Sequence, residues 1–371
     1  MMQTNRGLRI AGIFVGLVLL GLFVVYNQTF SCWDFRNNLW GPTFLLTDGQ
    51  SPYRVDALFD LGNAVWMPMV IGLFFPLGFL PLQQASNLWF IFNLIGILLI
   101  VWISSGSRRP SSTWLAVAIL TTLLFPPMVT HLWSGQITVL IALVFIIAAT
   151  FSEDIHPFFL AALIAIGLSK PQLSVLVVPG LLIHRIRVHG FSKTVGFGLL
   201  VILCMMIMTV PLFVAYPNWI PDFLFEVQQN PSWAHPSSLF FLSNTLPGIG
   251  PVLWAILFLI LSVLNARLWI NLPQQQAVFW SMAMTPLVTP YVWTWDFVML
   301  LPLFVSALFK AGTKISLAVL LGGYVTCWSL ITSFKLRGEV NDSLFWWIPW
   351  LFILFVVAST ILLRGNNANP G

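Results

Sequence analysis

Long apolar runs, separated by short polar segments, alternate along nearly the whole chain. The first run, Ile10 to Tyr26, contains no charged residue. A helix needs about 20 apolar residues to cross the hydrocarbon core of a bilayer. The pattern therefore predicts an all-α, polytopic membrane bundle of about 12 transmembrane helices. The predicted spans are 10–27, 84–104, 113–130, 137–152, 157–169, 172–184, 194–215, 251–268, 276–290, 295–310, 315–333 and 344–363.

Two stretches depart from the pattern of a simple span. Residues 65–82 are apolar, but three prolines interrupt them. We interpret this stretch as a re-entrant or juxtamembrane segment, because proline removes a helical hydrogen bond and breaks a helix. The runs 157–169 and 172–184 are short, and they predict two half-buried helices that meet around Lys170-Pro171.

Composition supports one membrane domain. Apolar residues make up 58% of the chain and charged residues 7%, against roughly 25% charged in soluble domains. Because no polar segment is long enough for a soluble domain, we expect residues 1–371 to form a single transmembrane domain. It has a first outer loop over 28–83, with membrane-surface helices, and a second large outer loop over 216–250. The net charge of +5 is spread over short loops and does not indicate nucleic acid.

The charges also predict an orientation. With the N-terminus inside, 11 of the 16 basic residues fall on the inner side and 9 of the 11 acidic residues on the outer side. This asymmetry satisfies the positive-inside rule. The N-terminus itself resembles an uncleaved signal anchor. We therefore expect a multi-pass protein of the cell membrane whose functional site lies on the extracytoplasmic side, where most non-basic polar segments are. The basic residues that remain outside are Arg36, Arg54, Lys170, Lys335 and Arg337.

Asp34 is the first candidate for chemistry. It follows the first span, lies between aromatic residues, and opens a segment that also carries Arg36, Asp48, Arg54, Asp56 and Asp60. Partial burial raises the pKa of a carboxylate and a nearby arginine lowers it, so Asp34 suits a general base that takes a proton from a hydroxyl. The alternative is a salt bridge to Arg36 that fixes the loop.

Lys170 is the second candidate, and it lies at a span end with no acidic neighbour in the sequence. Such a lysine must extend to the surface, pair with an acid, or face a polar cavity. A phosphate is one suitable partner, and a structural ion pair is the alternative.

Other polar and aromatic residues at outer span ends are candidates for substrate contacts. Each also has a structural interpretation, as a turn, a loop cap or part of an interfacial aromatic belt. Asp296 begins an apolar span, and we interpret it as an acid that stabilises a helix N-terminus. The candidates for substrate contacts are Tyr53, His131, Gln136, Gln172, Tyr291 and Trp293.

Several familiar motifs are absent. There is no phosphate-binding glycine-rich loop, no HExxH sequence and no nucleophile elbow, which argues against a nucleotide site. The three cysteines form no motif. We predict no cofactor. A divalent metal would require Asp34 to join Asp56 or Asp60, and hard cations need several oxygen ligands.

The order of several short motifs resembles glycosyltransferase family 87, of the GT-C superfamily, from residue 30 to about 300. The motifs are Trp33-Asp34-Phe35, Gly49-Gln50-Ser51-Pro52-Tyr53, Pro76-Leu77-Gly78-Phe79-Leu80-Pro81, Gly135-Gln136, Lys170-Pro171 and Thr289-Pro290-Tyr291-Val292-Trp293. The resemblance implies a GT-C-type bundle that takes a hexose, with mannose favoured, from a polyprenyl-phosphate carrier. The sugar passes to a hydroxyl of a lipid or glycan acceptor at the outer membrane face.

The resemblance also implies roles for residues. Asp34 maps to the catalytic base, and Lys170, with Arg36 and Arg54, to donor-phosphate binding. Tyr291 stands where a histidine is expected in the family's pattern, and this departure puts a histidine-based role there in doubt.

Two other classes of function remain open. A transporter or flippase of lipid-linked sugars would need polar residues through the membrane and on the inner face, whereas this chain concentrates them outside. A non-catalytic subunit of an envelope assembly would tolerate the loss of Asp34. The partners expected of the enzyme are the polyprenyl-phosphate sugar, the acceptor and membrane lipids, with no nucleic acid. The sequence does not predict an oligomeric state.

Overall fold

A computed structural model describes residues 2–29, 32–59, 66–106, 111–229, 235–338 and 341–367. Asp60, Arg108, Arg109 and Glu339 lie outside these ranges. Within them all regular secondary structure is helical, with no strand. The all-helical class predicted from the sequence is therefore confirmed.

The helices follow one another with short connections. Those of the first half are α1 (Met2–Thr29), η1 (Phe35–Trp40), α2 (Gly41–Thr47), η2 (Val55–Ala57), α3 (Pro68–Phe74), η3 (Phe75–Phe79), α4 (Leu82–Ser104), α5 (Ser112–Leu123), α6 (Pro126–Ser134), α7 (Thr138–Thr150), α8 (Pro157–Gly167) and η4 (Pro171–Leu173). Those of the second half are α9 (Val177–His189), α10 (Phe191–Ala215), α11 (Trp219–Gln229), α12 (Ser238–Thr245), α13 (Gly250–Asn271), α14 (Gln274–Val288), η5 (Thr294–Leu300), α15 (Leu301–Lys310), α16 (Lys314–Leu336), η6 (Asp342–Phe345) and α17 (Ile348–Asn367).

The number of clear spans is smaller than the sequence predicted. Six helical segments in the described ranges are long and apolar enough to cross a membrane, and a bent pair, α5 with α6, brings the number to seven. Five further predicted spans are helical but hold at most 17 residues in one run. At 1.5 Å per residue such helices fall short of the roughly 30 Å hydrocarbon core. The expected total of about 12 is therefore not confirmed.

The bend between α5 and α6 follows from the local sequence. Pro126 and Pro127 come directly after Phe125, and proline at these positions cannot continue the hydrogen bonds of the preceding helix. Helix α5 therefore ends at Leu123, and the axis turns by 63° before α6 begins.

The stretch interpreted as re-entrant forms only the short helices α3 and η3. Together, Pro68–Phe79 are too short to cross a bilayer alone. Gly72 lets α3 approach α10 closely, because a Cβ at this position would lie 1.7 Å from the carbonyl oxygen of Met208. The segment is thus packed against a long helix, as expected of a segment that does not span.

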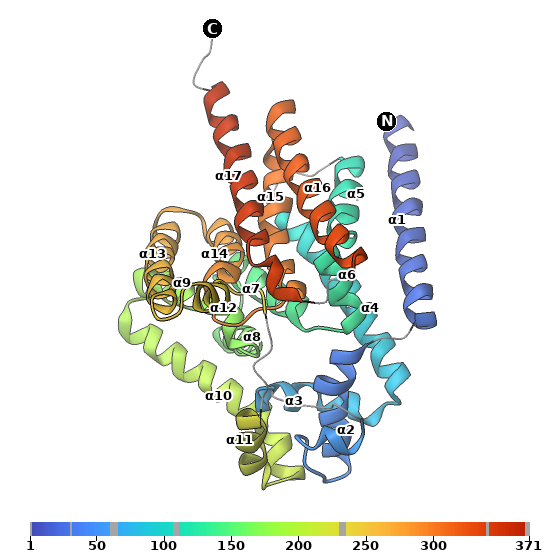
Figure 1. Ribbon diagram of the computed structural model, residues 1–371, viewed down its shortest axis with the longest axis vertical. Coiled ribbons are helices and arrows are strands. Elements are labelled where there is room, and N and C mark those ends of the chain that lie inside the picture. Colours follow the sequence, from blue (N-terminus) through green and yellow to red (C-terminus); the bar gives the residue numbers. More distant parts are fainter. Residues whose placement is uncertain are drawn as a thin grey trace.

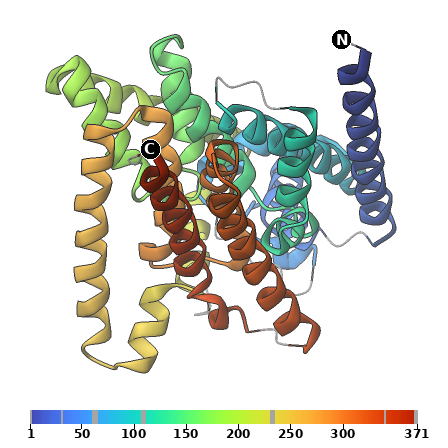
Figure 2. The same cartoon turned by 90° about the horizontal axis from the view of Figure 1, so that it is seen from above.

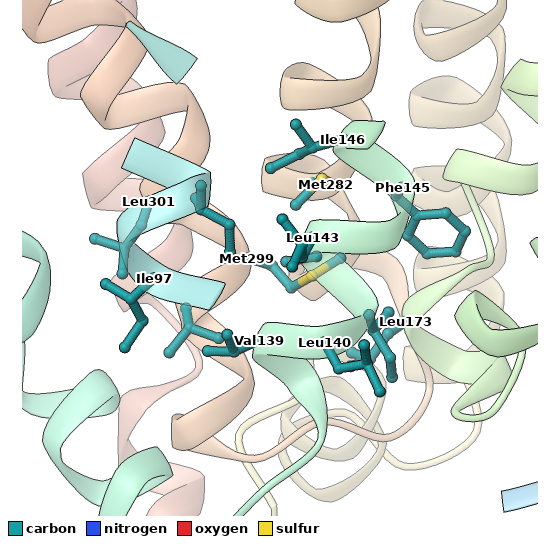
Figure 3. Packing of buried hydrophobic residues seen from close by; sticks show 14 of the residues in the cluster. Ile97, Val139, Leu140, Leu143, Phe145, Ile146, Leu173, Met282, Met299 and Leu301 are labelled. Carbon is teal, nitrogen blue, oxygen red and sulfur yellow. The ribbon is translucent and has the colours of Figure 1, made fainter. Parts of the chain in front are cut away.

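Helix α7 forms the centre of the bundle. Eleven of its 13 residues are buried, and α4, α8, α14 and η5 pack around it. Figure 3 shows Val139, Leu143 and Ile146 of α7 packed among side chains of these neighbours. A helix that is apolar on all sides must be buried, so its position follows from its sequence.

The long helices surround this centre. In Figures 1 and 2, α1 and α13 lie at opposite sides of the bundle. Only 11% of the apolar window of α1 is buried in the protein, which suits a helix that faces lipid. The N-terminal end of α1 and the C-terminal end of α17 lie at the same end of the molecule (Figure 1).

Polar contacts divide between two ends of the bundle. Each contact joins segments that the charge pattern had placed on the same side of the membrane. The inner contacts include Gln275 Nε2 to Ile103 O (2.9 Å), Ser152 Oγ to Gln274 Oε1 (2.7 Å) and Arg187 Nη1 to Ile270 O (2.8 Å). The outer contacts include Trp133 Nε1 to Thr29 Oγ1 (2.9 Å), Trp40 Nε1 to Leu80 O (2.9 Å) and Ser237 Oγ to Pro290 O (3.0 Å). The grouping of segments is thus the one expected from the sequence.

Candidate active site

A buried ion pair lies at the outer end of the bundle. Lys170 Nζ and Asp296 Oδ1 are 2.6 Å apart, and their side chains are 8% and 0% exposed. Lys170 precedes Pro171, which disfavours a helical conformation at the lysine. Helix α8 therefore ends before Lys170, which adopts φ −128° and ψ 80° ahead of η4. The structural alternative for Lys170, an ion pair, is thus present.

Asp296 has two more donors. Thr138 Oγ1, at the start of α7, donates to Oδ1 at 2.6 Å, and the backbone N–H of Trp293 donates to Oδ2 at 3.1 Å. The contact with Trp293 N–H is the helix-start role expected from the sequence. The partnership with Lys170 was not expected, and it makes Asp296 part of the site rather than a local cap.

Asp34 lies beside this pair. The carboxylate is buried, and Asn38 Nδ2 donates to its Oδ1 at 3.1 Å. Burial raises the pKa of Asp34 to about 6, and the nearby Lys170 ammonium and Gln136 amide oppose that rise. Gln136 also accepts from Lys170 Nζ at 3.5 Å, so its amide links the two charged groups. The predicted pairing of Asp34 with Arg36 is not among the contacts, since Arg36 Nε donates to Asn37 Oδ1.

A π-helix carries Asp34 into the site. Residues Phe35–Trp40 form η1, with Asp34 immediately before them. π-Helical turns are rare and are frequent at functional sites. The turn widens the backbone directly after the carboxylate, and Asn38 lies one turn further on, where it can bond Asp34.

Gly135 fixes the contact between this segment and the end of α6. Its φ is +75°, and a Cβ there would lie 2.5 Å from Cβ of Phe35. Trp89 Nε1 donates to the carbonyl oxygen of Gly135 at 2.9 Å. A glycine is required both by the left-handed backbone and by the close approach. Gln136 follows directly, so this turn positions the amide against Asp34.

Other predicted residues lie at the edge of the cluster. His131 is fully buried in α6, and its Nε2 lies 3.1 Å from Asn93 Oδ1. Tyr291 and Trp293 contact each other, with Trp293 Nε1 donating to Tyr291 Oη at 2.7 Å. Arg36 lies over the ring of Phe59, 4.3 Å from its centroid.

Three predicted residues are not brought to the charged centre. The Arg54 side chain is 62% exposed and pairs with Asp56 at 3.2 Å. Tyr53 is buried against Phe223 of α11. Gln172 lies in η4, without a contact to the charged groups among the described residues.

The carboxylates considered for a metal do not converge. Asp56 lies at the exposed pair with Arg54, away from Asp34, and Asp60 lies outside the described ranges. Within those ranges no group of three or more His, Cys, Asp or Glu side chains is arranged to hold a metal ion.

Sequence reasoning missed His235 as well as Asp296 and Thr138. The ring of His235 meets that of Tyr291 edge-on, with centroids 4.7 Å apart. Burial lowers the pKa of His235 to about 4, so the imidazole is neutral at pH 7. The structure therefore places a histidine next to Tyr291, but from the 216–250 loop. Its position in an outer loop was the available signal.

Comparison with known proteins gives one match. The model of glycosyltransferase family 87 matches residues 65–290, more than half of the chain. The matched range includes Gln136 and Lys170, begins after Asp34 and ends before Asp296. No curated protein and no solved structure matches the chain.

Proposed function

Because the chain belongs to glycosyltransferase family 87, we propose that it transfers a hexose, with mannose favoured, from a polyprenyl-phosphate carrier to a hydroxyl of a lipid or glycan acceptor. The observation that carries the proposal is the buried cluster of Asp34, Gln136, Lys170 and Asp296 at the outer end of a membrane bundle. A base and a fixed cation side by side are what a transfer from a phosphate leaving group needs.

Asp34 is the proposed general base. A pKa of about 6 leaves most of the carboxylate ionised at pH 7, yet makes it a stronger base than an ordinary aspartate. Asp34 takes the proton of the acceptor hydroxyl while the acceptor oxygen bonds to the anomeric carbon. The bond from that carbon to the phosphate oxygen breaks, and the phosphate leaves with the electron pair.

Lys170 is the proposed group that stabilises the leaving phosphate. Its ammonium has three N–H donors, and the contacts with Asp296 and Gln136 use two of them. The third remains for a phosphate oxygen. Because Asp296 and Gln136 hold the ammonium before the donor arrives, little reorganisation is needed during the reaction.

Arg36, two residues after Asp34, is the further candidate for the phosphate. The position of Arg54 in an exposed pair gives it a weaker claim. The same charge asymmetry that groups the segments supports a site on the extracytoplasmic face of the cell membrane.

The test is Asp34→Asn, which keeps the shape of the side chain and removes the base. Loss of a general base lowers rates by about 10²–10⁴-fold. Asp48→Asn is the matched control, because Asp48 lies exposed in the same outer loop. The assay measures transfer of radiolabelled mannose from polyprenyl phosphate in membranes, with protein abundance measured in parallel. Near-normal transfer by Asp34→Asn at normal abundance would refute the assignment.

A further inference from the structure

Two cations on the predicted outer side are not used by the proposed mechanism. Of the five basic residues placed there, Arg36, Arg54 and Lys170 have been considered above. Lys335 and Arg337 stand together at the C-terminal end of α16. Basic residues on the outer side oppose the positive-inside tendency, so this pair requires another explanation.

A groove leads from the middle of the bundle to Lys335. It lies between α5, α6 and α16 and has a volume of about 610 Å³, within the range of roughly 300–1,000 Å³ typical of ligand pockets. Its origin is the bend at Pro126. The bend separates the helices and frees backbone carbonyls, two of which accept from α16: Thr121 O from Tyr324 Oη at 2.7 Å and Leu124 O from Trp328 Nε1 at 2.9 Å.

The lining of the groove suits a hydrocarbon chain. Apart from the lysine its side chains are apolar, aromatic or threonine. Leu124, Val325 and Leu336 are 49%, 56% and 83% exposed, so the groove opens sideways along helices that can face lipid. Tyr324 and Lys335 are 11 positions apart on α16, which corresponds to about 16 Å. That length is about one leaflet, with the ammonium at its outer end.

Lys335 retains the capacity to bind an anion. Its Nζ donates to Asp342 Oδ1 at 3.3 Å, which uses one of three N–H donors. The other carboxylate oxygen of Asp342 accepts from Thr294 Oγ1 at 2.6 Å and from Thr294 N–H at 3.3 Å. Thr294 lies in η5, two residues before Asp296. The mouth of the groove is therefore joined to the charged centre through one short helix.

We infer that this groove holds a hydrocarbon chain of the acceptor, and that the acceptor is an anionic lipid whose phosphate contacts Lys335. The inference rests on the proposed transfer reaction. The donor phosphate is assigned to Lys170, which meets Asp296, whereas Lys335 meets Asp342. One phosphate cannot contact both lysines while these ion pairs remain, so the second cation belongs to the second substrate.

Selectivity comes from the cation rather than from the chain. Within a bilayer a lipid tail gains no hydrophobic free energy by moving from lipid to an apolar groove, because the two surroundings are equally apolar. The groove therefore orients the lipid, and Lys335 selects an anionic headgroup. Loss of one lysine near an anionic lipid lowers binding by about fivefold.

The first test measures lipid binding by the full-length protein in phosphatidylcholine nanodiscs. A phosphatidylglycerol with a photoreactive diazirine in its acyl chain is the probe, and adducts are located by mass spectrometry. We expect adducts on groove residues of α5 and α16 that fall about fivefold in Lys335→Gln. Lys314→Gln, at the opposite end of α16, is the control. Equal labelling by a diazirine phosphatidylcholine, or no effect of Lys335→Gln, would overturn the inference.

The second test follows the transferred sugar. Radiolabel from the polyprenyl-phosphate donor should enter an organic-soluble product that binds an anion exchanger and survives the mild acid that cleaves the donor. Lys335→Gln should raise KM for the acceptor and leave KM for the donor unchanged. A water-soluble product would overturn the acceptor assignment alone. The absence of any product would overturn the transferase proposal with it, while photolabelling still reports on the groove.

Discussion

The ion pair between Lys170 and Asp296 allows the sharpest test of the site, through a double-mutant cycle. The variants are Lys170→Met, Asp296→Asn and the combination of both. Lys170→Met leaves a fully buried carboxylate with only the donors of Thr138 and Trp293. Asp296→Asn leaves a lysine that is 8% exposed without its counter-charge. Removing one partner of a buried pair costs about 3–5 kcal/mol of stability.

The double variant should be less destabilised than the sum of the two single variants. It leaves no uncompensated charge, and close charge pairs show coupling energies of about 1.5–7 kcal/mol. The measurement is the free energy of unfolding in mixed micelles, together with sugar transfer by the same preparations. We expect the double variant to regain stability and to remain inactive, because methionine cannot stabilise a leaving phosphate.

Two results would contradict this reasoning. Additive losses of stability would show that the charges do not interact in the folded protein. Recovery of transfer in the double variant would show that Lys170 serves only as the partner of Asp296, and the phosphate role would then be wrong.

Three further predictions concern the pH profile, the turn at Gly135 and the topology. Because burial raises the pKa of Asp34 to about 6, kcat/KM should be steady above that pH and fall as the pH drops through it; a profile without this fall would contradict the role of Asp34 as base. Gly135→Ala forces a Cβ within 2.5 Å of Phe35 and into a left-handed backbone, so it should lower thermal stability and transfer, whereas Gly196→Ala, with open space around the added Cβ, should leave both nearly unchanged. An impermeant thiol reagent applied to intact cells should label Gln50→Cys and not Lys193→Cys, and the reverse would invert the topology; the native cysteines are buried, which keeps the background low.

Much of the charged centre was predictable from the sequence because its members lie at span ends. Asp34, Gln136 and Lys170 are polar residues that interrupt apolar runs, and the charge asymmetry assigns all three to one side. The partner of Lys170 was not predictable. Asp296 lies 126 positions away, and a local pattern explains it fully as a helix-start acid.

Proximity in the sequence misled the assignment of Arg54 and Tyr53. Both follow Asp34 closely, but the chain turns after α2, so that Tyr53 packs on α11 and Arg54 faces solvent. The number of spans failed for a related reason. Hydropathy does not distinguish a short helix buried in protein, such as α7, from a helix surrounded by lipid.

The separation of Lys170 from Asp296 along the chain also has a consequence for biosynthesis. At about 5–20 residues per second, the ribosome needs roughly 6–25 s to make the 126 positions between them. Throughout that interval the nascent protein contains the lysine and lacks its counter-charge. The break between α8 and α9 cannot close in its final form until η5 arrives, because an unpaired ammonium is costly inside a membrane. The last third of the chain therefore completes a centre whose other members were inserted first.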